Sequence, residues 1–186
     1  MALFPSLPSP AGLGDLLRRH PKGMGPLMAY LDALLRGESD LTIGERELIA
    51  AYVSGLNACT FCHSSHTLYA ELFGISPASL ETLLKHPESA PFGAKMQPLL
   101  AYVEKLNRLP ARLVAMDAQA VFAAGWSEAA LFDAVQICGA FNLMNRLVEG
   151  AGVDFDYSDN PDALPNRTAR AKHDHTYLDF AKRLGL

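Results

Sequence analysis

Helix start and stop signals follow one another along most of this chain and leave little room for other secondary structure. The clearest is TIGE at residues 42–45, where a threonine precedes a glutamate by three positions, the pattern of a capping box. It predicts a helix over residues 43–56. Ser127 predicts another capped helix, which runs to about Gly150. Strand-like alternation of polar and apolar residues is scarce, so the expected fold class is all-α.

The remaining expected helices are shorter, and each is bounded by a proline, a glycine or a capping residue. They cover approximately residues 10–20, 25–36, 59–73, 77–86, 98–106 and 117–124. Residues 154–166 are rich in Asp, Asn and Pro and are expected to form a loop. After this loop, Tyr177, Phe180 and Leu184 recur at helical spacing. They predict a C-terminal helix that docks on the rest of the protein.

Composition limits the classes of protein to which this sequence can belong. The chain has 186 residues, of which 49% are hydrophobic and 19% charged, and its net charge is −4. We expect a single multi-helix domain over residues 1–186, with its core at about 20–155 and a C-terminal loop and docking helix at 154–186. The negative charge argues against nucleic-acid binding, and no apolar stretch reaches the length of a membrane span. Because so apolar a chain often buries surface against another subunit, we expect a homo-oligomer.

The first ten residues are apolar, but they contain three prolines and no basic residue, so a signal peptide is not expected. A cytoplasmic location follows as the default expectation. In a reducing compartment, two cysteines that lie close in sequence indicate catalysis or metal binding rather than a static disulfide.

One group of residues combines two thiols with an imidazole at helical spacing, namely Cys59, Cys62 and His66. On a helix, positions i, i+3 and i+7 lie on one face, so these side chains are expected to be within reach of one another. Two Cα atoms three residues apart on a helix also fall in the range of about 4.4–6.8 Å that a disulfide tolerates. The pair could therefore form and break a disulfide with little movement of the backbone.

The surroundings predict how these thiols would be activated. Residues 55–58 break the preceding helix and put Cys59 near the N-terminus of its own helix, where unpaired N–H groups and the helix dipole favour a thiolate. Glu47 lies on the preceding helix in line with small residues, among them Ala51, which would let the cysteine helix approach. Its carboxylate could then reach His66 and fix the tautomer of the imidazole. The alternative is that Glu47 is an ordinary solvated charge.

Glu47, eleven intervening residues and then C-x-x-C-x-x-x-H together resemble the signature of the alkylhydroperoxidase D-like proteins of the carboxymuconolactone decarboxylase superfamily. The later run FNLMNRLVEGAGV, at residues 141–153, is similar to the helix that follows the active site in the peroxidase-related branch of that family. The resemblance covers roughly residues 20–155. It implies an all-helical subunit, assembled as a trimer or hexamer, with thiol-dependent peroxidase activity. We expect no cofactor and no bound metal.

The resemblance also implies a role for each residue of the group. By position, Cys62 corresponds to the cysteine that attacks the peroxide and Cys59 to the resolving cysteine, while His66 and Glu47 match the proton-relay residues. The partners are then an alkyl or other organic hydroperoxide and an external dithiol reductant. Phe61 departs from the pattern, because some family members have a second histidine there. The residues themselves leave open which cysteine attacks first, since the helix terminus favours Cys59 and the nearby imidazole favours Cys62.

Other interpretations use the same residues. The pair could be half of a zinc site with Cys138 and His173 or His175, but that spacing matches no usual pattern. It could instead serve a protein disulfide oxidoreductase or redox sensor. A decarboxylase-like protein without peroxidase activity is also possible, although such members lack the C-x-x-C pair. Outside a zinc site, Cys138 is interpreted as a small buried hydrophobe, and Asn142 and Asn145 as structural polar residues.

Overall fold

The structure is a computed structural model that describes residues 2–157 and 177–186. Within this part of the chain all regular secondary structure is helical, as the sequence predicted. The helices are α1 (Leu13–Arg19), α2 (Met24–Arg36), α3 (Ile43–Leu56), α4 (Thr60–Leu72), α5 (Pro77–Lys85), the short 3-10 helix η1 (Pro87–Ser89), α6 (Met96–Asn107), α7 (Ala115–Ala123), α8 (Glu128–Ala151) and α10 (Tyr177–Leu184). Of the expected loop at 154–166, only residues 154–157 are described, and they are not helical. No helix in the described ranges is both long enough and apolar enough to cross a membrane.

Helices of this protein begin at capping residues where the sequence contains them. The side chain of Thr42 accepts a hydrogen bond from the N–H of Glu45 at 3.2 Å, which completes the predicted start of α3. The predicted start of α1 at Pro10 is wrong, because Gly12 is the N-cap and the helix begins at Leu13. The segment before α1 is instead non-helical chain.

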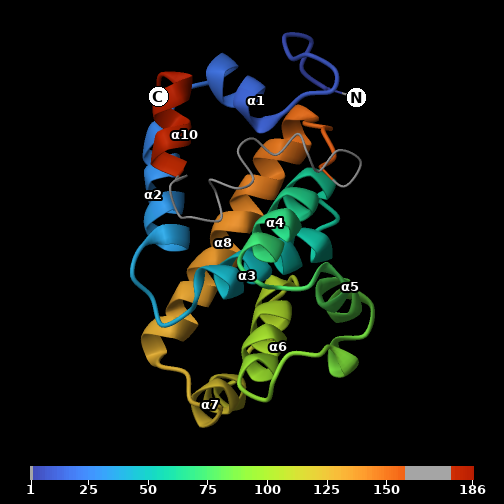
Figure 1. Ribbon diagram of the computed structural model, residues 1–186, viewed down its shortest axis with the longest axis vertical. Coiled ribbons are helices and arrows are strands. Elements are labelled where there is room, and N and C mark those ends of the chain that lie inside the picture. The colour runs from blue at the N-terminus through green and yellow to red at the C-terminus, as the bar shows by residue number, and fades with distance from the viewer. Residues whose placement is uncertain (1, 158–176) are drawn as a thin grey trace.

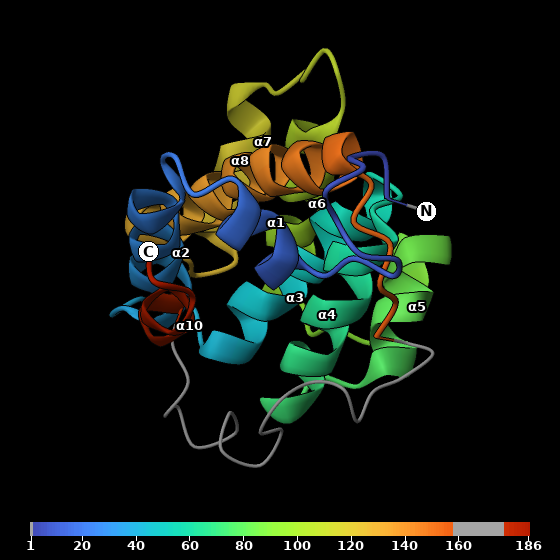
Figure 2. The ribbon, with the colours of Figure 1, turned by 90° about the horizontal axis from the view of Figure 1, so that it is seen from above.

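The longest helix, α8, runs along most of the molecule and organises the others (Figure 1). It packs against α3, α6 and α2, and the core includes the buried side chains of Tyr52 on α3 and Phe141 on α8. Seen from above, α1 lies between α8 and α4, and α10 lies beside α2 (Figure 2). The predicted stripe of Tyr177, Phe180 and Leu184 packs against the core from α10. The C-terminal helix therefore docks on the N-terminal helices.

Small residues let α3 and α4 approach each other closely. A Cβ at Gly44 would lie 2.8 Å from the carbonyl oxygen of Phe73, and one at Gly55 would lie 3.0 Å from Nδ1 of His63. His63 Nδ1 also donates a hydrogen bond to the carbonyl of Ala51 at 2.9 Å. The small residues of α3 thus permit the close approach that the sequence predicted. This approach places Glu47 of α3 against α4.

The turn between α3 and α4 determines where the first cysteine lies. Ala58 has a φ of +56°, in the left-handed region that residues with a Cβ disfavour. Directly after it, the N–H of Cys59 donates to the carbonyl of Ser54 at 3.0 Å. Cys59 is consequently the N-cap residue of α4, the position that the sequence predicted.

Candidate functional site

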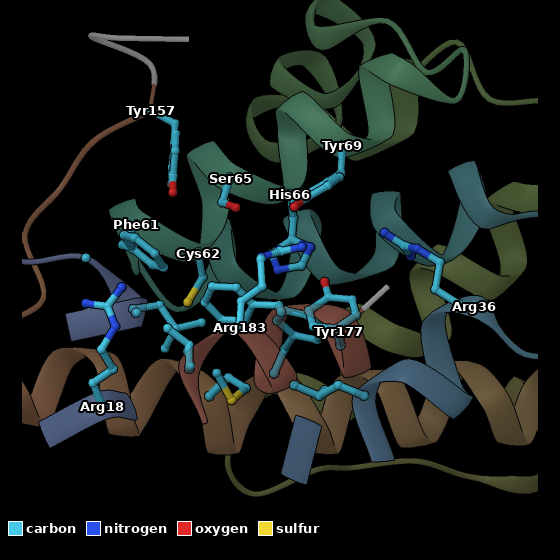
Figure 3. Close-up of a pocket in the computed structure, with 18 residues that line it drawn as sticks. Arg18, Arg36, Phe61, Cys62, Ser65, His66, Tyr69, Tyr157, Tyr177 and Arg183 are labelled. Carbon is cyan, nitrogen blue, oxygen red and sulfur yellow. The ribbon is translucent and has the colours of Figure 1, made fainter. Parts of the chain in front are cut away.

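The four residues predicted to act together lie around one cavity, which has a volume of about 510 Å³. Cys62 and His66, both on α4, line this cavity. Cys59 and Glu47 do not line it, but each contacts one of the two that do. Figure 3 shows the sulfur of Cys62 and the ring of His66 directed into the same space, with α8 below them and α10 in front. The structure therefore brings all four side chains together.

Glu47 is completely buried and contacts two basic side chains at once. Its Oε2 lies 2.6 Å from Nδ1 of His66, and its Oε1 lies 2.6 Å from Nη1 of Arg36. Burial alone would raise the pKa of Glu47, but Arg36 and His66 outweigh burial and lower the pKa to about 2. The carboxylate is therefore ionised near neutral pH and can only accept hydrogen bonds. Nδ1 of His66 must carry the hydrogen, which leaves Nε2 as the nitrogen that can take up or release a proton.

Sequence reasoning missed Arg36. It is the last residue of α2, where an arginine is an ordinary favourable charge at a helix C-terminus. In the structure its side chain is only 7% exposed. Its guanidinium carbon lies 5.7 Å from the ring centres of Tyr69 and Phe73 and 5.4 Å from that of Tyr177. Because Tyr177 belongs to α10, the C-terminal helix helps to bury this ion pair.

The two thiols of the C-x-x-C pair differ in both acidity and access. Both are free, with Cys59 fully buried and Cys62 only 3% exposed. The hydrogen bond between their side chains lowers the pKa of Cys59. The same hydrogen bond raises the pKa of Cys62, and burial raises it further. Thiolate character is consequently greater at Cys59, whereas access to the cavity belongs to Cys62.

A network of side-chain amides joins α6, α8 and the α3–α4 turn; its members are the buried Asn145 and the half-buried Asn57, Asn107 and Asn142. Asn145 accepts from Asn57 at 2.9 Å and donates to the hydroxyl of Ser54 at 3.1 Å. These bonds satisfy the amides as structural groups, in line with the sequence interpretation. Asn145 also hydrogen-bonds Cys62, where it opposes the rise in the pKa that Cys59 and burial cause. Asn145 therefore also acts on the Cys62 thiol, although its sequence position indicated only a structural polar residue.

Three other residues singled out by the sequence lie in different surroundings. Cys138 is buried on α8 outside the cavity lining, and burial raises its pKa to about 11. His63 points toward α3, where it binds a backbone carbonyl. Phe61 lines the cavity beside Cys62, with its ring centre 5.7 Å from that of Tyr157. The position at which some family members have a histidine therefore contributes an apolar wall here.

The zinc interpretation depended partly on His173 and His175, which lie outside the described residues. Within residues 2–157 and 177–186, no group of three or more His, Cys, Asp and Glu side chains is arranged to hold a metal ion.

Comparisons with known proteins agree with the fold. Residues 21–105 match the model of the Carboxymuconolactone decarboxylase family, and this segment includes all four predicted site residues. No curated protein matches the sequence. A solved structure of an uncharacterized peroxidase-related protein from Silicibacter sp. TM1040 is 26% identical, with a TM-score of 0.66 over 72% of this chain and 70% of that one.

Two further solved structures have the same fold. One is an uncharacterized peroxidase-related protein from Ralstonia eutropha JMP134, described as an alkylhydroperoxidase AhpD core, with 23% identity and a TM-score of 0.71 over 77% of this chain and 76% of that one. The other is a cysteine-to-alanine variant of the debrominase Bmp8 in complex with 2,3,4-tribromopyrrole, with 15% identity and a TM-score of 0.62 over 84% and 79%. The expected alkylhydroperoxidase D-like fold is confirmed.

Proposed function

We propose, from the match of residues 21–105 to the Carboxymuconolactone decarboxylase family and from the residues around the cavity, that this protein is a thiol-dependent peroxidase. It reduces alkyl or other organic hydroperoxides and so serves in antioxidant defence. One observation carries the proposal: Cys62 and His66 open onto one cavity, while Cys59 and Glu47 are buried in contact with them. A sulfur that can be oxidised, a second sulfur that can resolve it and an oriented proton donor thus meet at one place.

The first step oxidises Cys62. Its sulfur attacks the hydroxyl oxygen of the hydroperoxide, so that an S–O bond forms as the O–O bond breaks. The thiol hydrogen of Cys62 passes to the thiolate of Cys59, to which Cys62 is already hydrogen-bonded. The departing alkoxide takes a proton from Nε2 of protonated His66. The products are a sulfenic acid on Cys62, a thiol on Cys59, an alcohol and a neutral imidazole.

The second step forms the disulfide. Cys59 attacks the sulfenic acid of Cys62, and the oxygen leaves as water with the hydrogen of the Cys59 thiol. An external dithiol then reduces the disulfide by exchange, is itself oxidised to a disulfide, and restores both cysteines. This order gives Cys59 two successive roles, as the base that accepts the proton of Cys62 and as the resolving thiol.

Glu47 serves in this mechanism as an anion that orients His66. With a pKa of about 2 it carries no proton at neutral pH, so it cannot supply one to the imidazole. It fixes the tautomer and stabilises the positive charge that His66 bears before it donates its proton. After the external dithiol has restored the Cys59 thiol, that thiol ionises again, and the proton that it releases returns to Nε2 through solvent.

The burial of both sulfurs favours a small oxidant over a protein disulfide. In disulfide exchange with a folded partner, the partner's sulfur must meet a sulfur of this chain in line, which requires access. Here Cys59 is fully buried, and Cys62 is 3% exposed at the wall of a cavity. A slender hydroperoxide and a slender dithiol fit this entrance better than the surface of a folded protein does.

The test is consumption of cumene hydroperoxide with a small dithiol as reductant, by the wild type and by Cys59→Ser, Cys62→Ser and His66→Ala. We expect no turnover without Cys62, and a loss of about 100-fold or more in kcat without His66. Cys138→Ser is the matched control and should keep full activity. Dimedone should trap a sulfenic acid in Cys59→Ser, where Cys62 remains. Trapping only in Cys62→Ser would reverse the two cysteine roles, and a wild type without turnover would overturn the function.

A further inference from the structure

Cys59, the resolving cysteine of the proposed mechanism, needs a route by which its proton can reach solvent. Its side chain is fully buried and does not line the cavity. After the first step of that mechanism Cys59 is a thiol, yet the species that attacks a sulfur atom is the thiolate. In an in-line attack on the sulfenic acid of Cys62, the leaving oxygen lies on the side of Cys62 opposite to Cys59. The hydrogen of Cys59 therefore needs an acceptor of its own.

Helix α8 presents one polar side chain to each of the two sulfurs. Asn145 hydrogen-bonds Cys62, and Glu149 hydrogen-bonds Cys59. Asn145 and Glu149 are four positions apart on α8, so they lie on one face of this helix. Val148, which precedes Glu149, is buried in one apolar cluster with both cysteines. The last turns of α8 are thus packed against the C-x-x-C pair and place a carboxylate at Cys59.

Glu149 differs from its neighbours because it reaches solvent. Asn145 is 1% exposed and Cys59 is fully buried, whereas Glu149 is exposed. Glu149 does not line the cavity, so it meets solvent outside the space that contains Cys62. Its hydrogen bond and its charge both raise the pKa of Cys59, because they favour the thiol over the thiolate. A hydrogen-bonded series therefore runs from Cys62 through Cys59 to Glu149 and ends at solvent.

We propose that Glu149 is the general base of the resolving step: it accepts the thiol proton of Cys59 as Cys59 attacks the oxidised Cys62, and it passes that proton to solvent. The S–H bond of Cys59 breaks, the S–S bond forms and the S–O bond of the sulfenic acid breaks. The oxygen leaves as water after it takes up one proton from solvent on the cavity side, so the overall balance of the step is unchanged. The inference rests on the peroxidase function proposed above, but the same proton transfer accompanies any attack of Cys59 on an oxidised Cys62.

A small aromatic disulfide tests this step without peroxide. Dithiodipyridine should form a mixed disulfide with Cys62 and release one thiopyridone, and attack by Cys59 then releases the second. Glu149→Gln should slow the second release by about 100-fold or more and leave the first within about threefold of the wild type. A carboxylate that acted only through its charge would give the opposite sign, because its loss lowers the pKa of Cys59 and makes the thiolate easier to form.

Two further variants separate a base from a structural residue. Glu149→Ala leaves space beside Cys59, so added acetate should restore part of the second release in proportion to its concentration. Glu128→Gln removes the same charge from the exposed first turn of α8 and is the matched control, which should behave as the wild type. Unchanged or faster release in Glu149→Gln, an equal loss in Glu128→Gln, or a loss in Glu149→Ala that acetate does not relieve would each overturn the inference.

Peroxide turnover separates this inference from the function on which it rests. With cumene hydroperoxide, Glu149→Gln should accumulate the sulfenic acid of Cys62, which dimedone then traps although both cysteines are present. A wild type that consumes no hydroperoxide, in a protein whose second thiopyridone release depends on Glu149, refutes the peroxidase function alone. A wild type that consumes hydroperoxide, with Glu149→Gln equal to it in both assays, refutes the role of Glu149 alone.

Discussion

His66 donates from Nδ1 to the carboxylate of Glu47 at 2.6 Å, across the interface between α3 and α4. Arg36 holds the other oxygen of the same carboxylate, so a cation, an anion and an imidazole form one buried chain that ends at the cavity. Removing a buried charge from water is unfavourable unless its partners have good geometry. The series Arg36–Glu47–His66 meets that condition with two short contacts, and loss of Arg36 or His66 would leave the buried carboxylate with one partner instead of two.

Replacement of Arg36 by methionine should change the pH dependence of peroxide turnover. Without the guanidinium, burial is opposed only by His66, and the pKa of Glu47 should rise from about 2. Below the new pKa, a protonated Glu47 no longer fixes the imidazole, so activity should fall on the acid side by about tenfold or more. Arg36→Lys should restore part of the wild-type profile, because it keeps the charge.

The measurement is kcat with cumene hydroperoxide between about pH 5 and pH 8, where the wild-type Glu47 does not titrate. Arg108→Met, which removes an exposed arginine from outside the cavity, is the control for a general effect of lost charge. A profile for Arg36→Met that matches the wild type at all pH values would refute the positioning role.

Local sequence signals predicted the helices, whereas the rest of the site depends on how the helices pack against one another. Caps such as Thr42 and Ser127 satisfy the first N–H groups of their own helices, so they can be recognised within a few residues of sequence. At the start of α6 the prediction was two residues late, because Pro98 is accommodated in the first turn and does not mark its first residue.

The sequence predicted the proximity of Cys59, Cys62 and His66 because all three residues lie on or beside one helix. The role of Arg36 could not be predicted from the sequence, because it depends on how α2 packs against α3 and on the docking of α10. An arginine at a helix C-terminus is already explained by its favourable interaction with the helix dipole. Nothing in the sequence around Arg36 indicates that it pairs with a carboxylate on another helix. Only the packed structure reveals that partner.

Acid should destabilise this protein through Glu47. Its pKa in the folded state, about 2, lies below the ordinary value of 4.5, so the stability that it contributes is present above pH 4.5 and is lost as the pH falls toward 2. At roughly 1.4 kcal/mol per pH unit, the loss amounts to about 3 kcal/mol across this window. Urea unfolding of the wild type and of Arg36→Met/Glu47→Gln should therefore give free energies that diverge with pH. Parallel curves between pH 5 and about pH 2.5 would contradict the expectation.

Oxidation should consume two thiols per chain and spare the third. Cys59 and Cys62 are hydrogen-bonded to each other, whereas Cys138 is buried on α8 with its pKa raised to about 11. Cys62 lines the cavity and can pass its hydrogen to Cys59, whereas Cys138 lies outside the lining and its hydrogen-bond partners are the side-chain amides of Asn107 and Asn142, so Cys138 should react slowly with peroxide. Thiol counting before and after one equivalent of hydroperoxide should show the loss of two, with Cys138 reacting only after the chain is unfolded. Loss of one thiol or of three would be incompatible with a disulfide confined to the C-x-x-C pair.

The turn that precedes Cys59 makes a prediction about stability. Ala58 adopts a φ of +56°, which strains a residue with a Cβ by about 1–2 kcal/mol, while glycine adopts it freely. Glycine also gives the unfolded chain more entropy, an opposing effect of roughly 0.4–1 kcal/mol. Ala58→Gly should therefore raise the free energy of unfolding slightly, by up to about 1 kcal/mol.

The control for Ala58→Gly is Ala120→Gly on the exposed side of α7, where the backbone is helical and the same change should cost about 1 kcal/mol. Denaturant unfolding of the two variants should thus give shifts of opposite sign. Because Cys59 is held by its own hydrogen bond to the Ser54 carbonyl, peroxide turnover by Ala58→Gly should stay close to that of the wild type. A destabilised Ala58→Gly would mean that the left-handed residue is not strained, and the turn would then owe its shape to the helices on either side of it.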